Sequence, residues 1–281
     1  MEKLQKALQK AREQRGGDIG MPSPRPAAPS REDDTARPAA AVETTGADAL
    51  WKALPAFDPD RKVLERNRIV TANAGRESSA YDILRTKIML TMRKNGWSRL
   101  AITSPTMSCG KTTTACNLAI GFARNPDLRS IFLEFDLRRP NMARTLGLPE
   151  RPDITEMLMG ERPFAEQGVR YRDNVAFSAA SRVSEDPTSV LTSKTIYHTL
   201  ERLESDYAAD LMVLDLPPLL VGDDTRAVLK DVDCAMLVAR ADATTVPQID
   251  LCEREIVEHT NMLGIVLNRC RDIDDDYGYY E

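Results

Sequence analysis

The chain has 281 residues, of which 42% are hydrophobic and 29% charged, and its formal net charge is -5 at pH 7. This composition is typical of a globular protein with a buried core, and the negative charge argues against nucleic acid or an anionic membrane surface as a partner. No apolar stretch approaches the roughly 20 residues of a membrane-spanning helix, and five cysteines without paired spacing favour a reducing cytoplasm.

The first sixty residues are predicted to contain a short helix and a linker. Residues 1–15 carry apolar side chains at the spacing of one helix face, namely Leu4, Ala7, Leu8 and Ala11. An amphipathic helix of this kind fits either a frayed terminus or a docking helix for a partner. Residues 16–60 are rich in proline, alanine, glycine, threonine and charged residues, a composition that predicts a flexible, disordered linker.

Residues 61–271 alternate between strand and helix patterns and are predicted to form one α/β domain. Apolar runs predict strands at residues 98–104, 130–136, 174–180, 210–218, 234–240 and 263–268. Helical patterns predict helices at residues 110–125, 195–207 and 247–262. The alternation implies a mostly parallel sheet with helices on both faces. In such sheets, ligands bind outside the carboxyl ends of the strands.

The first predicted strand leads into the sequence SPTMSCGKTTT, residues 104–114. Its Gly-Lys-Thr, between a strand and a helix, is the second half of a P-loop. In a P-loop, the lysine reaches the β- and γ-phosphates, the threonine hydroxyl holds Mg²⁺, and backbone N–H groups surround the phosphates. The strict pattern has glycine where this chain has Pro105. The candidate nucleotide-binding residues are Ser108, Cys109, Gly110, Lys111, Thr112 and Thr113.

Two further predicted strands end in carboxylates. Residues 130–136 deliver Glu134 and Asp136, and residues 210–218 deliver Asp215, the position of a Walker B acid. A single aspartate at a strand end is more often a turn cap than a functional group. Three such features in the right order, at strand ends of a parallel sheet, favour a nucleotide-binding protein.

Three segments, in chain order, resemble the Walker A, Walker A′ and Walker B boxes of the bacterial tyrosine kinases: SPTMSCGKTTTACNLA, LEFDLRRP and LMVLDLPPLLVGDD. The segments YDILRTKI, DITEMLMG and LGIVLN and the tyrosine-containing end of the chain are also similar, so that the resemblance covers roughly residues 62–281. It implies a P-loop NTPase-like fold and an ATP-dependent protein-tyrosine autokinase. Kinases of this family regulate the polymerisation and export of capsule and exopolysaccharide.

The resemblance also implies roles for individual residues. Lys111, Asp136 and Asp215 would be catalytic, and Mg²⁺ would be held by Thr112, Asp136 and Asp215. Asp136 would lie near the γ-phosphate and accept the tyrosine proton, because a phenol with a pKa near 10 benefits from a base. Asn268 would lie beside the adenine.

The acidic C-terminal tail, residues 272–281, would be the substrate. It contains three of the seven tyrosines, Tyr277, Tyr279 and Tyr280, and the resemblance implies that a neighbouring subunit phosphorylates them. It further implies a transmembrane chain-length regulator as activator, a cognate tyrosine phosphatase and a homo-oligomer. The protein would then be cytoplasmic and peripheral at the inner membrane.

The chain departs from the family pattern at three places. The loop has Met107 and Ser108 where the family usually has proline and glycine, and Glu134 replaces the first of two Walker A′ aspartates. These changes predict weaker phosphate binding and a misplaced carboxylate. The helix before the first strand usually reads Glu-x-x-Arg-x-x-Arg and builds a ring of subunits. This chain has Ser79, Asp82 and Arg85 at those positions.

Two other functions remain open on the sequence. The first is a nucleotide-binding adaptor of the polysaccharide machinery with weakened catalysis, which the departures favour. The second is a partitioning-type ATPase of the deviant Walker family, which shares the fold. That group has a signature lysine four residues before the loop glycine, where this chain has Thr106, and it has no use for a tyrosine tail.

Overall fold

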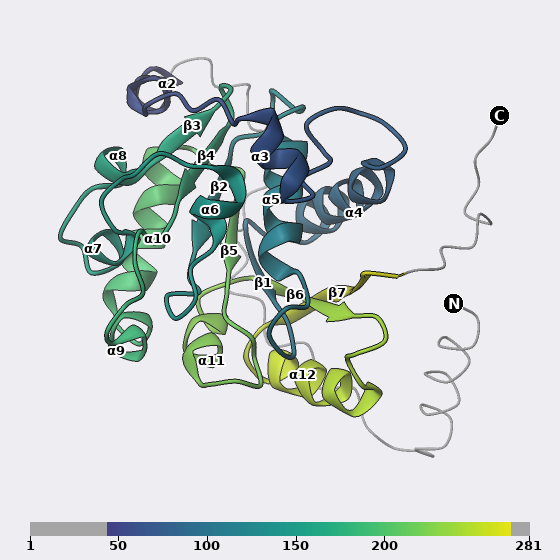
Figure 1. Cartoon of the computed structure of the whole chain (residues 1–281). Helices are drawn as coiled ribbons and strands as arrows, with labels where there is room; N and C mark the ends of the chain where they lie inside the picture. Colours follow the sequence, from purple (N-terminus) through teal and green to yellow (C-terminus); the bar gives the residue numbers. More distant parts are fainter. Residues whose placement is uncertain (1–43, 271–281) are drawn as a thin grey trace. The chain divides into compact units, whose positions relative to one another are not determined.

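The computed structural model describes residues 44–270, which contain one seven-stranded sheet with the strand order β3-β4-β2-β5-β1-β6-β7 (Figure 1). The strands are β1 (Arg99–Thr103), β2 (Ser130–Glu134), β3 (Val169–Tyr171), β4 (Val175–Ser178), β5 (Leu211–Asp215), β6 (Cys234–Arg240) and β7 (Asn261–Asn268). Every neighbouring pair is parallel except β3 and β4. The predicted α/β fold with a mostly parallel sheet is confirmed.

Alternate residues of the strands supply two apolar cores, one on each face of the sheet. In β1, Leu100 and Ile102 belong to one core and Ala101 to the other, as the two-residue period of a strand requires. The Leu100 face is covered by α3 (Arg61–Arg66), α4 (Ser79–Asn95), α5 (Lys111–Phe122) and α6 (Met142–Leu146). The Ala101 face is covered by α2 (Thr44–Ala53), α7 (Ile154–Leu158), α8 (Phe164–Gln167), α9 (Pro187–Leu191), α10 (Thr195–Asp206), α11 (Asp224–Leu229) and α12 (Val246–His259).

Helix α2 corrects the predicted boundary of the domain. It lies inside the segment predicted as linker, and its Trp51 is only 2% exposed and Leu54, just beyond the helix, only 1%. The chain then pairs with the sheet edge, because Phe57 N–H donates to the Arg170 carbonyl (2.7 Å) and Arg170 N–H to the Pro55 carbonyl (2.8 Å). The linker prediction is therefore wrong over residues 44–60. An average composition of small and polar residues concealed two large apolar side chains that the core needs.

Three predicted segments fall outside the described residues. These are the helix at residues 1–15, the part of the linker before residue 44, and the tail at residues 272–281 with Tyr277, Tyr279 and Tyr280. Within residues 44–270, no helix is both long and apolar enough to cross a bilayer.

Candidate functional site

The loop between β1 and α5 has the backbone of an anion-binding loop. Gly110 has a φ of 94°, a conformation that favours glycine, and a Cβ there would lie 2.2 Å from Asn268 Nδ2. The first helical bond of α5 runs from Thr114 N–H to the Gly110 carbonyl (2.9 Å). The N–H groups of Lys111, Thr112 and Thr113 thus lie outside the helical pattern, at the positive end of the helix dipole. An anion such as a phosphate is favoured here.

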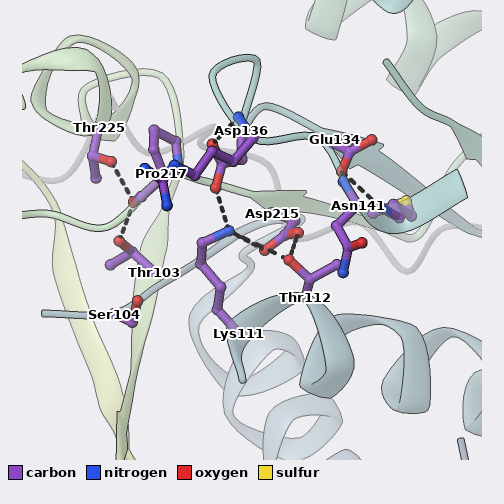
Figure 2. Close-up of polar contacts among 12 residues, drawn as sticks. Thr103, Ser104, Lys111, Thr112, Glu134, Asp136, Asn141, Asp215, Pro217 and Thr225 are labelled. Atoms are coloured by element: carbon purple, nitrogen blue, oxygen red, sulfur yellow. Dashed lines mark hydrogen bonds and ion pairs between the residues drawn. The ribbon is translucent and has the colours of Figure 1, made fainter. Parts of the chain in front are cut away.

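The side chains of Lys111, Asp136 and Asp215 meet beside this loop (Figure 2). The Lys111 ammonium donates to Asp136 Oδ2 at 2.7 Å and lies 3.7 Å from Asp215 Oδ1. The Thr112 hydroxyl donates to Asp215 Oδ2 at 2.6 Å. All four side chains are buried. The parallel sheet explains the meeting, because β5 lies between β1 and β2 and the three strands end at the same edge.

Burial and charge act in opposite directions on these groups. Burial lowers the pKa of Lys111, but the carboxylates of Asp215 and Asp136 outweigh it and hold the pKa above its ordinary value. Burial raises the pKa of Asp215, and the attraction of Lys111 and the Thr112 hydrogen bond only partly offset this rise. Asp215 therefore carries a desolvated charge that one lysine does not fully compensate. An additional cation at this point would be favoured.

The residues present fit Mg²⁺. Asp215 Oδ1 is buried and has no hydrogen-bond partner among the described residues, which leaves one carboxylate oxygen for a cation or its water. The Thr112 hydroxyl lies beside the same carboxylate. Residues 44–270 contain no cluster of three or more histidine, cysteine, aspartate or glutamate side chains that would hold a metal ion alone. Mg²⁺ would therefore be shared with the phosphates of a nucleotide, as is usual for this ion.

Glu134 lies outside this group and has a structural role. Its carboxylate accepts hydrogen bonds from the backbone N–H groups of Met142 (2.7 Å) and Asn141 at the start of α6, and of Ala180 (3.1 Å) after β4. Burial raises the pKa of Glu134 to about 7 against the effect of these bonds. The sequence suggested that glutamate in place of aspartate would misplace a catalytic carboxylate. That prediction loses its basis, because the longer Glu134 side chain instead reaches three backbone amides.

Replacing Glu134 with aspartate, the residue of the family pattern, should therefore lower stability rather than raise activity. Shortening the side chain by one methylene withdraws it from buried N–H donors, each of which costs about 1–3 kcal/mol when unsatisfied. We expect a fall in the thermal midpoint of about 2–10 °C, measured by calorimetry. Glu150→Asp, at an exposed position, is the matched control and should change nothing. Faster phosphate transfer in Glu134→Asp at unchanged stability would return Glu134 to the catalytic group.

Other predicted site residues occupy the loop and its rim. Ser108 has a φ of 61°, in the left-handed region that favours glycine. Cys109 is 1% exposed and fills the loop interior. Asn268, at the end of β7, donates from Nδ2 to the Cys109 carbonyl (2.9 Å) and so joins the last strand to the loop. The adenine contact expected for Asn268 stays a prediction.

The residues at the positions expected from the resemblance to build a ring of subunits are engaged within the molecule. Arg85 donates to the Gly121 carbonyl of α5 and lies 3.6 Å from Asp82, and Asp82 also accepts from Arg124. Ser79 begins α4. The only arginine that survives from the ring motif thus serves the packing of α4 on α5.

Sequence reasoning missed the groups that hold the loop after β5. The Pro217 carbonyl accepts from the hydroxyls of Thr103 (2.7 Å) and Thr225 (2.7 Å), as Figure 2 shows. Arg138 pairs with Asp224 of α11 and donates to Thr188 of α9 (3.0 Å), so it joins the segment after β2 to both helices. The Pro-Pro pair two residues after Asp215 was the available signal, because it fixes the direction of the chain there.

Comparisons with known proteins identify relatives of this domain. No protein-family model matches the chain. AmsA of Erwinia amylovora is 27% identical over 199 residues, which are 70% of this chain but only 27% of AmsA. Tyrosine-protein kinase YwqD of Bacillus subtilis is 25% identical over 222 residues, 77% of this chain and 92% of YwqD. The kinase domain of Escherichia coli tyrosine kinase ETK superposes with a TM-score of 0.60 at 25% identity, over 70% of this chain and 78% of that domain. The chain thus spans about a quarter of the length of some curated relatives.

Proposed function

The chain belongs to the bacterial tyrosine kinase family, and on this premise we propose that it transfers the γ-phosphate of ATP to tyrosine in its own C-terminal tail. The observation that supports this most directly is the position of Lys111 between Asp136 and Asp215 at the start of α5. Phosphate transfer depends mainly on positioning and charge neutralisation, and these groups supply both.

Each group has a defined task in this proposal. The N–H groups at the start of α5 and the Lys111 ammonium bind the phosphates, so Lys111 exchanges its bond to Asp136 for phosphate oxygens. Thr112 and Asp215 would hold Mg²⁺, which would neutralise developing charge when bound. Asp136, released from Lys111, accepts the proton of the acceptor phenol. Tyr277, Tyr279 and Tyr280 are the acceptors.

The biological setting is also part of the proposal. By its kinship, the protein regulates polymerisation and export of capsule or exopolysaccharide at the inner face of the membrane. A transmembrane chain-length regulator would activate it and a tyrosine phosphatase would remove the phosphates.

A nucleotide-binding adaptor remains the second candidate, because of the left-handed backbone at Ser108. A serine there strains the loop by about 1 kcal/mol, a cost that glycine avoids. The other argument for an adaptor, the change at Glu134, is weakened by the backbone contacts of that side chain.

Intact mass spectrometry before and after incubation with Mg-ATP tests the proposal. The protein should gain mass in steps of one phosphate, and neither Lys111→Ala nor a variant with phenylalanine at positions 277, 279 and 280 should gain any. A parallel sample should contain the cytoplasmic segment of the candidate activator. No gain in either sample, from folded protein that begins unphosphorylated, would make the adaptor the leading account.

A further inference from the structure

A cavity of about 300 Å³ lies on the face of the sheet opposite α5, apart from the nucleotide loop. Four helices border it, of which α10 contacts α2 and α7, and α7 contacts α8 (Figure 1). Its residues Leu203 and Tyr207 precede the start of β5, whereas Asp215 stands at the other end of that strand. A molecule in this cavity therefore does not occupy the place of a nucleotide held by Lys111.

The floor of the cavity is apolar. Met157, Phe164 and Leu203 belong to the buried core of this face, and the partly buried Leu50 packs against that core. Sites for small molecules are mostly lined in this way, with a few polar groups that fix the orientation of the ligand. The volume is at the lower end of the range of such sites, which suits a ligand with one ring and short substituents.

Tyr207 brings to this floor a polar group that the protein does not use. The side chain is only 4% exposed, and its ring packs edge-to-face on Trp51 at 6.0 Å and on Phe164 at 5.0 Å. Its hydroxyl has no hydrogen-bond partner among residues 44–270. Burial raises the pKa of Tyr207 to about 12, so the hydroxyl keeps its proton at neutral pH. Buried hydroxyls are normally hydrogen-bonded, and a ligand in the cavity supplies the missing partner.

The rim of the cavity carries charges of both signs. Arg202 is exposed and has no ion-pair partner within the described part of the chain, whereas Arg162 is already paired with Glu166 (2.9 Å). The exposed carboxylates of Glu161 and Asp206 also border the cavity. An unpaired guanidinium and two carboxylates at one rim suit a ligand that bears both an anionic and a cationic group.

The wall between α7 and α8 is preformed. The N–H groups of Glu161 (2.8 Å) and Arg162 (3.2 Å) both donate to the Glu156 carbonyl, and the Arg162 side chain also pairs with the Glu156 carboxylate. Gly160 has a φ of 77°, a conformation that favours glycine. A wall that is ordered without a ligand lowers the entropic cost of binding one.

We propose that this cavity is a second ligand site, which binds a free aromatic amino acid whose ring carries a hydroxyl, namely L-tyrosine. The aromatic ring lies against Met157, Phe164 and Leu203. Its phenol accepts the hydrogen bond of the buried Tyr207 hydroxyl. The carboxylate of the ligand pairs with Arg202 at the rim, and its ammonium is attracted by the two acidic side chains there.

Trp51 reports on the cavity because its ring packs on Tyr207. In a Trp97→Phe variant of the full chain, Trp51 is the only tryptophan, and it can be excited at a wavelength that tyrosine does not absorb. We expect L-tyrosine to change the Trp51 emission to saturation, with a dissociation constant below about 1 mM. L-Phenylalanine should bind at least about tenfold more weakly, because it leaves the Tyr207 hydroxyl unpaired.

Two further variants locate the bound amino acid. Tyr207→Phe keeps the ring and removes only the hydroxyl, so L-tyrosine should lose its preference of about tenfold over L-phenylalanine. Arg202→Gln should weaken both amino acids by a similar factor, at least about fivefold, and leave the preference in place. Arg93→Gln, at an exposed position of α4, is the matched control and should change neither affinity.

The inference fails on any of three results. One is the absence of both a saturable change in emission and a heat of binding in calorimetry with L-tyrosine up to about 1 mM. Another is a preference for L-tyrosine that survives in Tyr207→Phe, or affinities that Arg202→Gln leaves unchanged. The third is displacement of L-tyrosine by Mg-ADP, which would assign the binding to the nucleotide loop. These measurements record binding alone, so their outcome does not depend on the proposed kinase function.

Discussion

Replacing Asp215 with asparagine should lower the rate of phosphate transfer at least about 100-fold, or about 2.7 kcal/mol of transition-state stabilisation, while the protein stays folded. The carboxylate is buried, and one of its oxygens has no hydrogen-bond partner among residues 44–270. The fold disfavours its charge, since burial raises the pKa of Asp215. Asparagine keeps the shape and removes the charge, so Mg²⁺ binding is lost without a cost in stability.

Two measurements separate the effect of Asp215→Asn on Mg²⁺ binding from its effect on stability. Mg-ADP should raise the thermal midpoint of the wild-type protein, and the Mg²⁺-dependent part of that rise should vanish in Asp215→Asn. The midpoint without ligand should stay within a few degrees of wild type.

Asp153→Asn is the contrasting control. Burial alone raises the pKa of Asp153, but hydrogen bonds from Thr155 and Ser181 outweigh burial and hold it below the ordinary value. The charge here stabilises the fold, so its removal should cost about 1–3 kcal/mol and leave Mg²⁺ binding intact. An Asp215→Asn protein that transfers phosphate at the wild-type rate would exclude Asp215 from the metal site.

The grouping of Lys111, Asp136 and Asp215 was predictable from sequence because of parallel topology. The residues are far apart in the chain, but each follows a strand, and parallel strands end at a common edge. Strand order was not needed for this prediction. The strand pattern alone indicated the fold and the location of the site.

The contacts of Glu134 and Arg85 could not be predicted from the strand pattern. Both were compared with a family pattern, which records residue types and not their partners. Glu134 binds backbone amides at the start of α6 and after β4, and Arg85 binds a carbonyl of α5. Partners of this kind depend on how separate segments pack, and no local spacing encodes them. The antiparallel β3, with three residues, was missed because its pattern is too short to detect.

Replacing Trp51 with alanine should cost about 3–5 kcal/mol of stability, although the residue lies in a segment with a linker-like composition. Trp51 is 2% exposed, its Nε1–H donates to the Tyr207 carbonyl (2.7 Å), and its ring packs edge-to-face on Tyr207 at 6.0 Å. The change removes a large buried ring and leaves a buried carbonyl without its donor. The thermal midpoint should fall by about 6–20 °C.

Trp97→Ala is the internal comparison, because the chain has only two tryptophans and Trp97 is partly exposed. It should cost less than Trp51→Ala, since a partly exposed side chain loses less transfer free energy when it is removed. Equal effects of the two changes, or a Trp51→Ala protein as stable as wild type, would return the domain boundary to residue 61. The expected result, a larger loss of stability for Trp51→Ala than for Trp97→Ala, instead makes α2 a part of the domain. The helix is then held on the face of the sheet opposite α5.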